Sequence, residues 1–168
     1  MRLTPIAFSA AIILGTLASA GLGQKPDDQI DARSVALAQQ GQALNAQGRF
    51  SDAIDLLETA LAVDPRNRQA YIGLAHAAEG QKLPGKAIKL YFEALKLEPN
   101  DVNALSGQGE ALVQRGAVER ARQNLVRIRT VCGKPCPQAT TLAAAIAKGP
   151  PAEVVTAQRP DTGAPAHN

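Results

Sequence analysis

Cys132 and Cys136 are the only cysteines of the 168-residue chain, and they lie four positions apart in the stretch TVCGKPCPQAT. Such a pair can close a disulfide, exchange thiols, or supply two thiolates to a metal ion. A structural zinc site needs four ligands, and the pair alone supplies two. The three alternatives make different demands on the surrounding structure, so the elements that hold the pair must be identified first.

No other set of residues forms a catalytic pattern. The chain has two histidines, His76 and His167, and its acidic residues are scattered rather than paired at a fixed spacing. Asp27 and Asp28 precede the first helical pattern in a predicted linker, which cannot hold an acid and a base in register. Gly107 and Gly109 lie inside a helical pattern and lack the preceding strand of a nucleotide-binding loop. We therefore expect a non-catalytic protein without a cofactor or a metal.

The N-terminus has the layout of a secretory signal peptide. One positive charge at Arg2 precedes an apolar run, and Ala18, Ser19 and Ala20 supply small residues for cleavage. Residues 1–20 are predicted to be the signal peptide and residues 21–33 a linker with a helix lead-in. We expect a periplasmic protein, in a compartment where paired cysteines are usually oxidised. The alternative is an inner-membrane anchor formed by an uncleaved segment.

The apolar residues favour a helical protein. The chain has no Trp, three Phe and two Tyr, so its core must be built from Leu, Ala, Ile and Val. Several residue types then recur at a spacing of 34 positions, which predicts stacked units of two helices each. Ser51 is expected to cap the second helix of the first unit. The repeated positions are Ala53, Ala87 and Ala121; Leu37, Tyr71 and Leu105; Pro65 and Pro99; and Gly41 and Gly109, two periods apart.

This pattern resembles the tetratricopeptide repeat, a helix-turn-helix unit with small residues where its two helices approach each other. The resemblance implies an all-α, right-handed α-solenoid with repeats at 34–67, 68–101 and 102–135. A capping helix at 138–148 is expected to cover the last repeat with Leu142, Ala145 and Ile146, because a solenoid must hide its terminal apolar face. Residues 149–168 contain few apolar residues and are predicted to be a disordered tail.

The resemblance also implies a function, since tetratricopeptide arrays bind segments of other proteins in a concave groove. We expect a protein or peptide partner and no nucleic acid. The groove positions include no Lys or Arg, so the carboxylate clamp of some family members is absent. Asn45 and Asn103 are expected to bond the backbone of a partner. The implied lining residues are Gln42, Asn45, Gln69, Ile72, His76, Glu79, Asn103, Ser106, Glu110 and Val113.

Two alternatives remain for the function. Between Arg115 and Lys134 the chain carries six basic residues and one acidic residue, mostly on the predicted second helix of the third repeat. That outward face could dock a structural accessory subunit onto an envelope complex. The other alternative is metal or redox delivery through Cys132 and Cys136. These cysteines fall in the turn before the capping helix, where a disulfide is the favoured interpretation.

Overall fold

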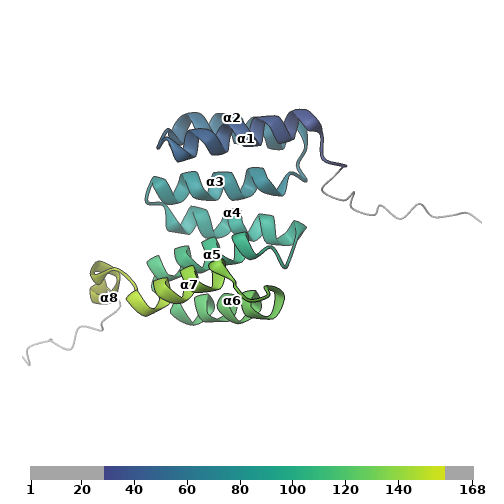
Figure 1. The fold of residues 1–168 in the computed structure, drawn as a ribbon. Helices are drawn as coiled ribbons and strands as arrows, with labels where there is room; N and C mark the ends of the chain where they lie inside the picture. Colours follow the sequence, from purple (N-terminus) through teal and green to yellow (C-terminus); the bar gives the residue numbers. More distant parts are fainter. Residues whose placement is uncertain (1–28, 158–168) are drawn as a thin grey trace, which may run out of the picture.

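The computed structural model describes residues 29–157, which form helices and turns with no strand in that range. The predicted all-α solenoid is confirmed: three helical hairpins stack in sequence, and a further helix closes the stack (Figure 1). The helices of the described part are α1 (Ala32–Ala46), α2 (Phe50–Val63), α3 (Arg68–Gly80), α4 (Pro84–Leu97), α5 (Val102–Gln114), α6 (Val118–Val131), α7 (Pro137–Lys148) and α8 (Ala152–Ala157).

Side-chain caps mark the first helix of each hairpin. Asp31 accepts a hydrogen bond from the amide of Arg33 at α1, Asn67 caps α3, and Asp101 caps α5. Each cap pairs an amide that would otherwise lack a partner at the helix N-terminus. The second helices α2, α4 and α6 begin without such a cap. The expectation that Ser51 caps α2 is wrong, because α2 already begins at Phe50 and Ser51 lies in its first turn.

Small residues allow the helices to pack closely within and between hairpins. Ala53, Ala87 and Ala121 are completely buried, as their 34-residue spacing predicts. A Cβ atom on Gly41 would lie 2.6 Å from Leu57 Cγ, and one on Gly73 would lie 2.7 Å from Leu57 Cδ2. The side chain of Leu57 therefore fills space that two glycines leave open, which joins the first hairpin to the second.

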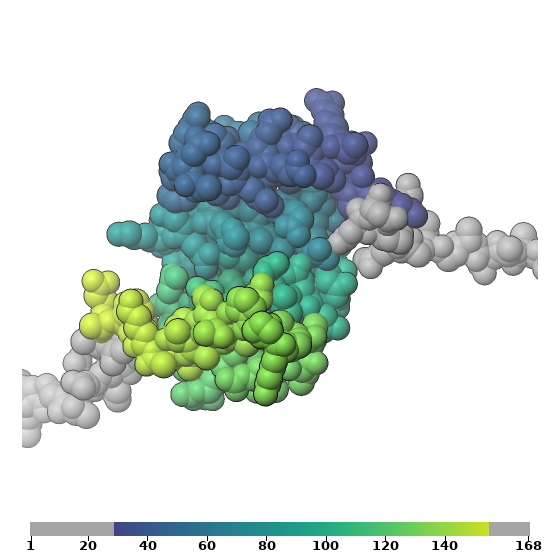
Figure 2. All heavy atoms as spheres, viewed as in Figure 1, coloured from purple at the N-terminus to yellow at the C-terminus, as the bar shows by residue number. Residues whose placement is uncertain are grey.

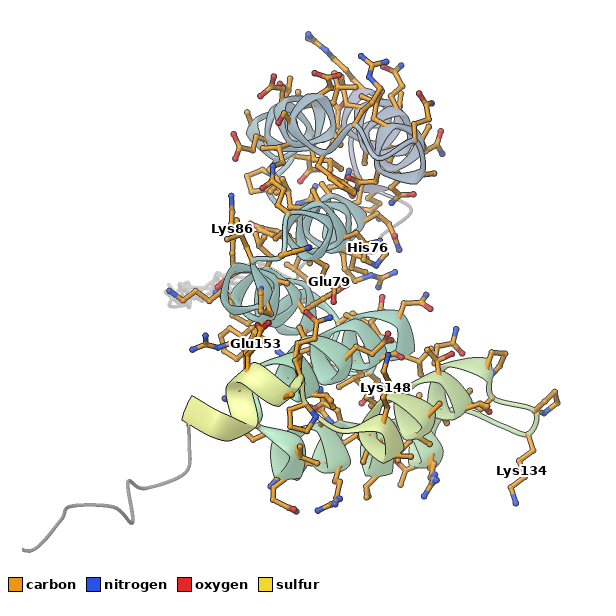
Figure 3. The ribbon with its side chains drawn as sticks, turned by 90° about the vertical axis from the view of Figure 1, so that its left-hand side faces the viewer. His76, Glu79, Lys86, Lys134, Lys148 and Glu153 are labelled. Carbon is orange, nitrogen blue, oxygen red and sulfur yellow. A yellow bond between two sulfur atoms is a disulfide. The ribbon has the colours of Figure 1, made fainter. Side chains whose placement is uncertain are left out.

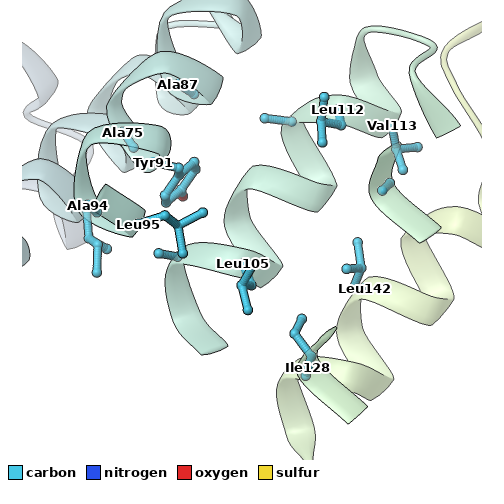
Figure 4. Packing of buried hydrophobic residues seen from close by; sticks show 14 of the residues in the cluster. Ala75, Ala87, Tyr91, Ala94, Leu95, Leu105, Leu112, Val113, Ile128 and Leu142 are labelled. Atoms are coloured by element: carbon cyan, nitrogen blue, oxygen red, sulfur yellow. The ribbon is translucent and has the colours of Figure 1, made fainter. Parts of the chain in front are cut away.

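The main core extends from the second hairpin to the closing helix (Figure 4). Tyr91, Leu105 and Leu142 are among its fully buried side chains. The Leu142 side chain packs directly onto Gly109, where a Cβ atom would come within 2.6 Å of both of its methyl carbons. Helix α7 thus covers the last repeat as predicted, with Leu142 at the centre of the contact.

Polar contacts also join neighbouring hairpins. The guanidinium Nε of Arg68 lies 2.8 Å from Asp101 Oδ2, which links the start of α3 to the start of α5. Asn67 donates to the hydroxyl of Ser34 over 2.8 Å, and that hydroxyl donates to the carbonyl of Ala60. These side chains are mostly buried, so their hydrogen bonds help to fix the relative positions of the repeats.

The described part of the predicted disordered tail contains a short helix. Helix α8 occupies residues 152–157, and the amide of Val154 donates to the carbonyl of Pro151. Proline immediately before a helix and an acidic residue, Glu153, in the first turn both favour helix initiation. The prediction overlooked these local signals because it considered only the scarcity of apolar residues.

The predicted signal peptide and most of the linker lie outside the described residues, as does the chain beyond residue 157. Within residues 29–157 no helix is both long enough and apolar enough to cross a bilayer.

Candidate functional site

The first helices of the hairpins and helix α7 together form one face with a hollow of about 480 Å³. Figure 2 views this face, with α7 in yellow-green below the surface formed by α1 and α3. The closing helix occupies the position that the first helix of a fourth repeat would take, so it extends the face as well as capping the core. The hollow is lined by Gln42, Gln69, Ile72, His76, Glu79, Tyr91, Asn103, Ser106, Gly107, Glu110, Pro137, Gln138 and Thr141.

The structure brings eight of the ten residues implied by the repeat register into this hollow. Asn45 does not line it: its Nδ2 donates over 2.8 Å to the carbonyl of Gly73, so the amide braces α1 against α3. Val113 is buried and faces a neighbouring hollow with Lys148 instead. One N–H of the Asn45 amide is thus used inside the protein, and bonding of Asn45 to the backbone of a partner stays a prediction.

Asn103 remains in the hollow, where it contacts the closing helix. Gln138 Nε2 donates to Asn103 Oδ1 over 2.9 Å. The contact ties the start of α5 to the start of α7 and leaves the exposed Asn103 side chain at the rim. Its carbonyl oxygen is thus engaged by the protein itself, which reduces the acceptor capacity that Asn103 offers to a partner.

Tyr91 reaches the hollow from the second helix of its hairpin. Its ring is completely buried, yet its hydroxyl donates over 2.9 Å to Glu79 Oε2 on α3. The path is open because Gly107 has no side chain: a Cβ atom there would lie 2.3 Å from both Cζ and Oη of Tyr91. The phenol therefore forms part of the floor between α3 and α5.

The carboxyl groups of Glu79 and Glu110 lie near each other in the partly desolvated floor. Burial raises the pKa of Glu79 to about 7; the hydrogen bond from Tyr91 opposes this rise and the nearby Glu110 adds to it. Burial also raises the pKa of Glu110, against a hydrogen bond from Ser106. Burial and the Glu79 carboxylate together raise the pKa of Tyr91, so the phenol stays protonated and donates.

His76 stands beside these groups on the same side of α3, facing α5 and α7 (Figure 3). Its ring packs edge-on against Tyr91, with the centroids 5.9 Å apart. Desolvation lowers the pKa of His76, so the imidazole is neutral at neutral pH. Among the described residues that line the hollow, no side chain is positively charged at pH 7.

Tyr91, Gly107 and the α7 residues that line the hollow are absent from the positions implied by the repeat register. Tyr91 occupies the same repeat position as Leu57 and Leu125, a position typical of core packing. The signal that could have revealed it is the polar hydroxyl at a position where the other repeats carry Leu. The α7 residues were missed because that helix was considered only as a cap.

The cysteines lie just before the N-terminus of α7 and are not among the residues that line the hollow. Cys132 and Cys136 form a disulfide that spans the turn between α6 and α7. Around them is a separate depression lined by Arg129, Lys134 and Thr140, among others. Within residues 29–157 no group of three or more His, Cys, Asp or Glu side chains could hold a metal ion.

The outward face of α6 carries the predicted basic residues. Arg120, Arg122, Arg127 and Arg129 are all exposed, and Glu119 pairs with Arg122. Two apolar side chains near this face are also exposed, Phe92 at 55% and Val126 at 60%.

Comparison with known proteins agrees with this architecture. The tetratricopeptide repeat family model matches residues 38–96 and 84–127. A barley (Hordeum vulgare) protein named Probable UDP-N-acetylglucosamine–peptide N-acetylglucosaminyltransferase SPINDLY is 30% identical over 87 residues, which are 52% of this chain and 9% of that protein. Bovine (Bos taurus) DnaJ homolog subfamily C member 3 is 28% identical over 92 residues, 52% of this chain and 18% of that protein. The chain therefore corresponds to a small part of each relative.

Solved structures share the same fold. The Sgt2 TPR domain from Aspergillus fumigatus superposes with a TM-score of 0.65 at 22% identity, covering 82% of this chain and 89% of that domain. The first TPR of Spaghetti (RPAP3), bound to the HSP90 peptide SRMEEVD, gives 0.64 at 22% identity, with coverages of 71% and 94%. The Yersinia enterocolitica secretion chaperone SycD, in complex with a YopD peptide, gives 0.60 at 16% identity, with coverages of 71% and 92%.

Proposed function

The chain belongs to the tetratricopeptide repeat family, and from that premise we propose that it is a non-catalytic module of the bacterial cell envelope that binds a polypeptide segment in the hollow. The observation that carries the proposal is the continuous concave face of α1, α3, α5 and α7. Structural neighbours with this fold were solved with bound peptides, from HSP90 in one case and from YopD in another.

The character of the hollow supports recognition of a peptide rather than catalysis. Amides and hydroxyls line most of it, including Gln69, Asn103, Ser106 and Thr141. Such groups can pair with the donors and acceptors of an extended backbone while tolerating varied side chains. The nearby carboxyls of Glu79 and Glu110 lie beside a phenol that remains protonated.

The envelope location rests on two features of the chain. The first is the signal-like N-terminal sequence, which lies outside the described residues. The second is the disulfide between Cys132 and Cys136, since such bonds persist mainly in oxidising compartments. Detection of the intact N-terminus in the cytoplasmic fraction would count against this location.

A pair of neighbouring threonines allows a matched test of the binding face. Thr141 lines the hollow, whereas Thr140 lies in the depression beside the disulfide, and both are exposed. A photo-crosslinking amino acid placed at Thr141 should capture a polypeptide from an envelope extract, to be identified by mass spectrometry. The same amino acid at Thr140 should capture much less. Equal capture from both positions would contradict binding in the hollow.

The exposed arginines favour a second candidate function, a structural accessory subunit. The charged face of α6, with Phe92 nearby, could attach to an acidic surface of an envelope complex. Such an association should weaken as salt is added, because exposed charges are screened. Association that is salt-sensitive and indifferent to changes in the hollow would favour this candidate over peptide binding.

A further inference from the structure

The charged groups in the floor of the hollow carry only negative charge at neutral pH and above. The ionisable residues among its lining are His76, Glu79, Tyr91 and Glu110. His76 is neutral and Tyr91 keeps its proton, because burial shifts both groups toward their uncharged forms. Within residues 29–157, neither glutamate forms an ion pair with a Lys, Arg or His side chain.

Each glutamate is held by one oxygen and has the other oxygen available. Glu79 Oε2 accepts the hydrogen bond from Tyr91, and Glu110 Oε1 lies 3.2 Å from the Ser106 hydroxyl. The second oxygen of each carboxyl accepts no hydrogen bond from residues 29–157. Tyr91 fixes the Glu79 carboxyl, and the single proton of the Ser106 hydroxyl is shared between Glu110 and the carbonyl of Gln138. Both carboxyl groups keep an acceptor that can receive donors from outside the protein.

We propose that the floor of the hollow receives the side chain of a lysine or arginine from the bound polypeptide, paired with Glu79 and Glu110. This inference rests on the proposed function, since it identifies the residue type that the bound segment must carry. The ammonium or guanidinium group of this side chain would donate hydrogen bonds to the free carboxylate oxygens. Hydrogen bonds between a cation and a carboxylate are stronger than those between neutral groups.

The apolar part of the hollow matches the stem of such a side chain. Ile72, one turn before His76 on α3, lines the hollow with 4% of its surface exposed. Lysine and arginine side chains bury their methylene groups against apolar surface while their heads reach polar groups. A metal ion fits less well, because no cluster of three ligating side chains exists within the described residues.

The local charge runs against the charge of the whole molecule. The chain has a formal net charge of +3, so long-range attraction favours acidic partners. The neighbour solved with the HSP90 peptide SRMEEVD holds a segment richer in acidic than basic residues. A preference of this chain for basic peptides would therefore have to come from the hollow itself.

Protonation of the two glutamates should weaken binding of the basic side chain. The pKa of Glu79 is about 7, so its charge is mostly lost between pH 8 and pH 6. Loss of charge on Glu110, whose pKa is also raised, and protonation of His76 act in the same direction as pH falls. The charged group nearest these residues on α7 is Lys148, which lines the neighbouring hollow together with Glu110.

The test compares synthetic peptide pools that differ at one central residue. Pools of uncharged sequence with a central lysine, arginine, norleucine or glutamate are titrated against the purified full chain at pH 8. We expect the lysine and arginine pools to bind at least about tenfold tighter than the norleucine pool. Their affinity should fall by about tenfold at pH 6, as Glu79 becomes protonated.

Three variants test whether the preference for a basic residue comes from the glutamates in the floor of the hollow. Glu79→Gln and Glu110→Gln should each remove most of the preference for a basic residue while retaining binding of the norleucine pool. Glu58→Gln, which removes the same charge from an exposed position on α2, should leave the preference unchanged. Circular dichroism of each variant verifies that it is folded.

The outcomes separate the inference from the function on which it rests. If all pools bind equally, or if the preference survives both Glu79→Gln and Glu110→Gln, the proposed pairing of a basic side chain with the two glutamates is wrong and peptide binding stands. If no pool binds to the folded chain, peptide binding in the hollow fails and the pocket fails with it.

Discussion

Replacement of Gly107 by alanine tests how the floor of the hollow is built. The added methyl group would lie 2.3 Å from Cζ and Oη of Tyr91, so the buried ring would have to shift. Forcing the ring aside costs about 1–3 kcal/mol, and breaking its hydrogen bond to the Glu79 carboxyl costs about 1.5–3 kcal/mol. Alanine is better than glycine within a helix by about 1 kcal/mol, which offsets part of the loss. We expect Gly107→Ala to lower the free energy of unfolding by about 1.5–5 kcal/mol.

Gly85→Ala is the matched control, because a Cβ atom at Gly85 has no neighbour within 4 Å. Gly85 lies in the first turn of α4, and its replacement should leave stability unchanged or raise it by up to about 1 kcal/mol. Urea unfolding followed by circular dichroism at equal protein concentration gives both values. If Gly107→Ala proves as stable as Gly85→Ala, then the phenol of Tyr91 does not lie against Gly107, and the described floor is wrong.

Two further predictions concern the disulfide and the carboxyl groups. The double variant Cys132→Ser, Cys136→Ser should lose about 2 kcal/mol of stability, from the loop entropy of a short ring, while binding in the hollow is kept. Thermal unfolding measures the loss; a loss of binding at unchanged stability would indicate a thiol function instead. Because the folded-state pKa of Glu79 is raised, the contribution of Glu79 to stability should fall as pH rises from 5 to 8, whereas the lowered pKa of His76 gives a contribution of opposite sign. Glu79→Gln should flatten that dependence, as measured by unfolding at several pH values, and an unchanged slope would contradict a buried Glu79.

The repeat period predicted the helices well because it reports packing that recurs with the same geometry. Ala53, Ala87 and Ala121 are spaced by 34 positions, and each is completely buried against its partner helix. Leu142 was predicted to cover the last repeat and is fully buried against Gly109. In such an array each unit contacts only its neighbours, so local sequence determines most of the fold.

The candidate site was predicted less completely because it depends on single side chains that do not repeat. Tyr91 lies in the series that contains Leu57 and Leu125, and only its hydroxyl and the absence of a side chain at Gly107 bring it into the hollow. Asn45 has the register of a groove residue, but its amide turns sideways to the carbonyl of Gly73. A register specifies which face a residue occupies, whereas the hydrogen bonds of its side chain depend on neighbours in other repeats.

The most direct test of the central claim is to map where a bound peptide changes the amide resonances of the chain. The peptide is the tightest binder from the pools, added to the ¹⁵N-labelled protein at pH 8. Binding in the hollow predicts the largest chemical-shift changes at residues of its lining, such as Gln69, Ser106 and Thr141. Changes concentrated on the arginine face of α6, with the lining residues unaffected, would contradict the account.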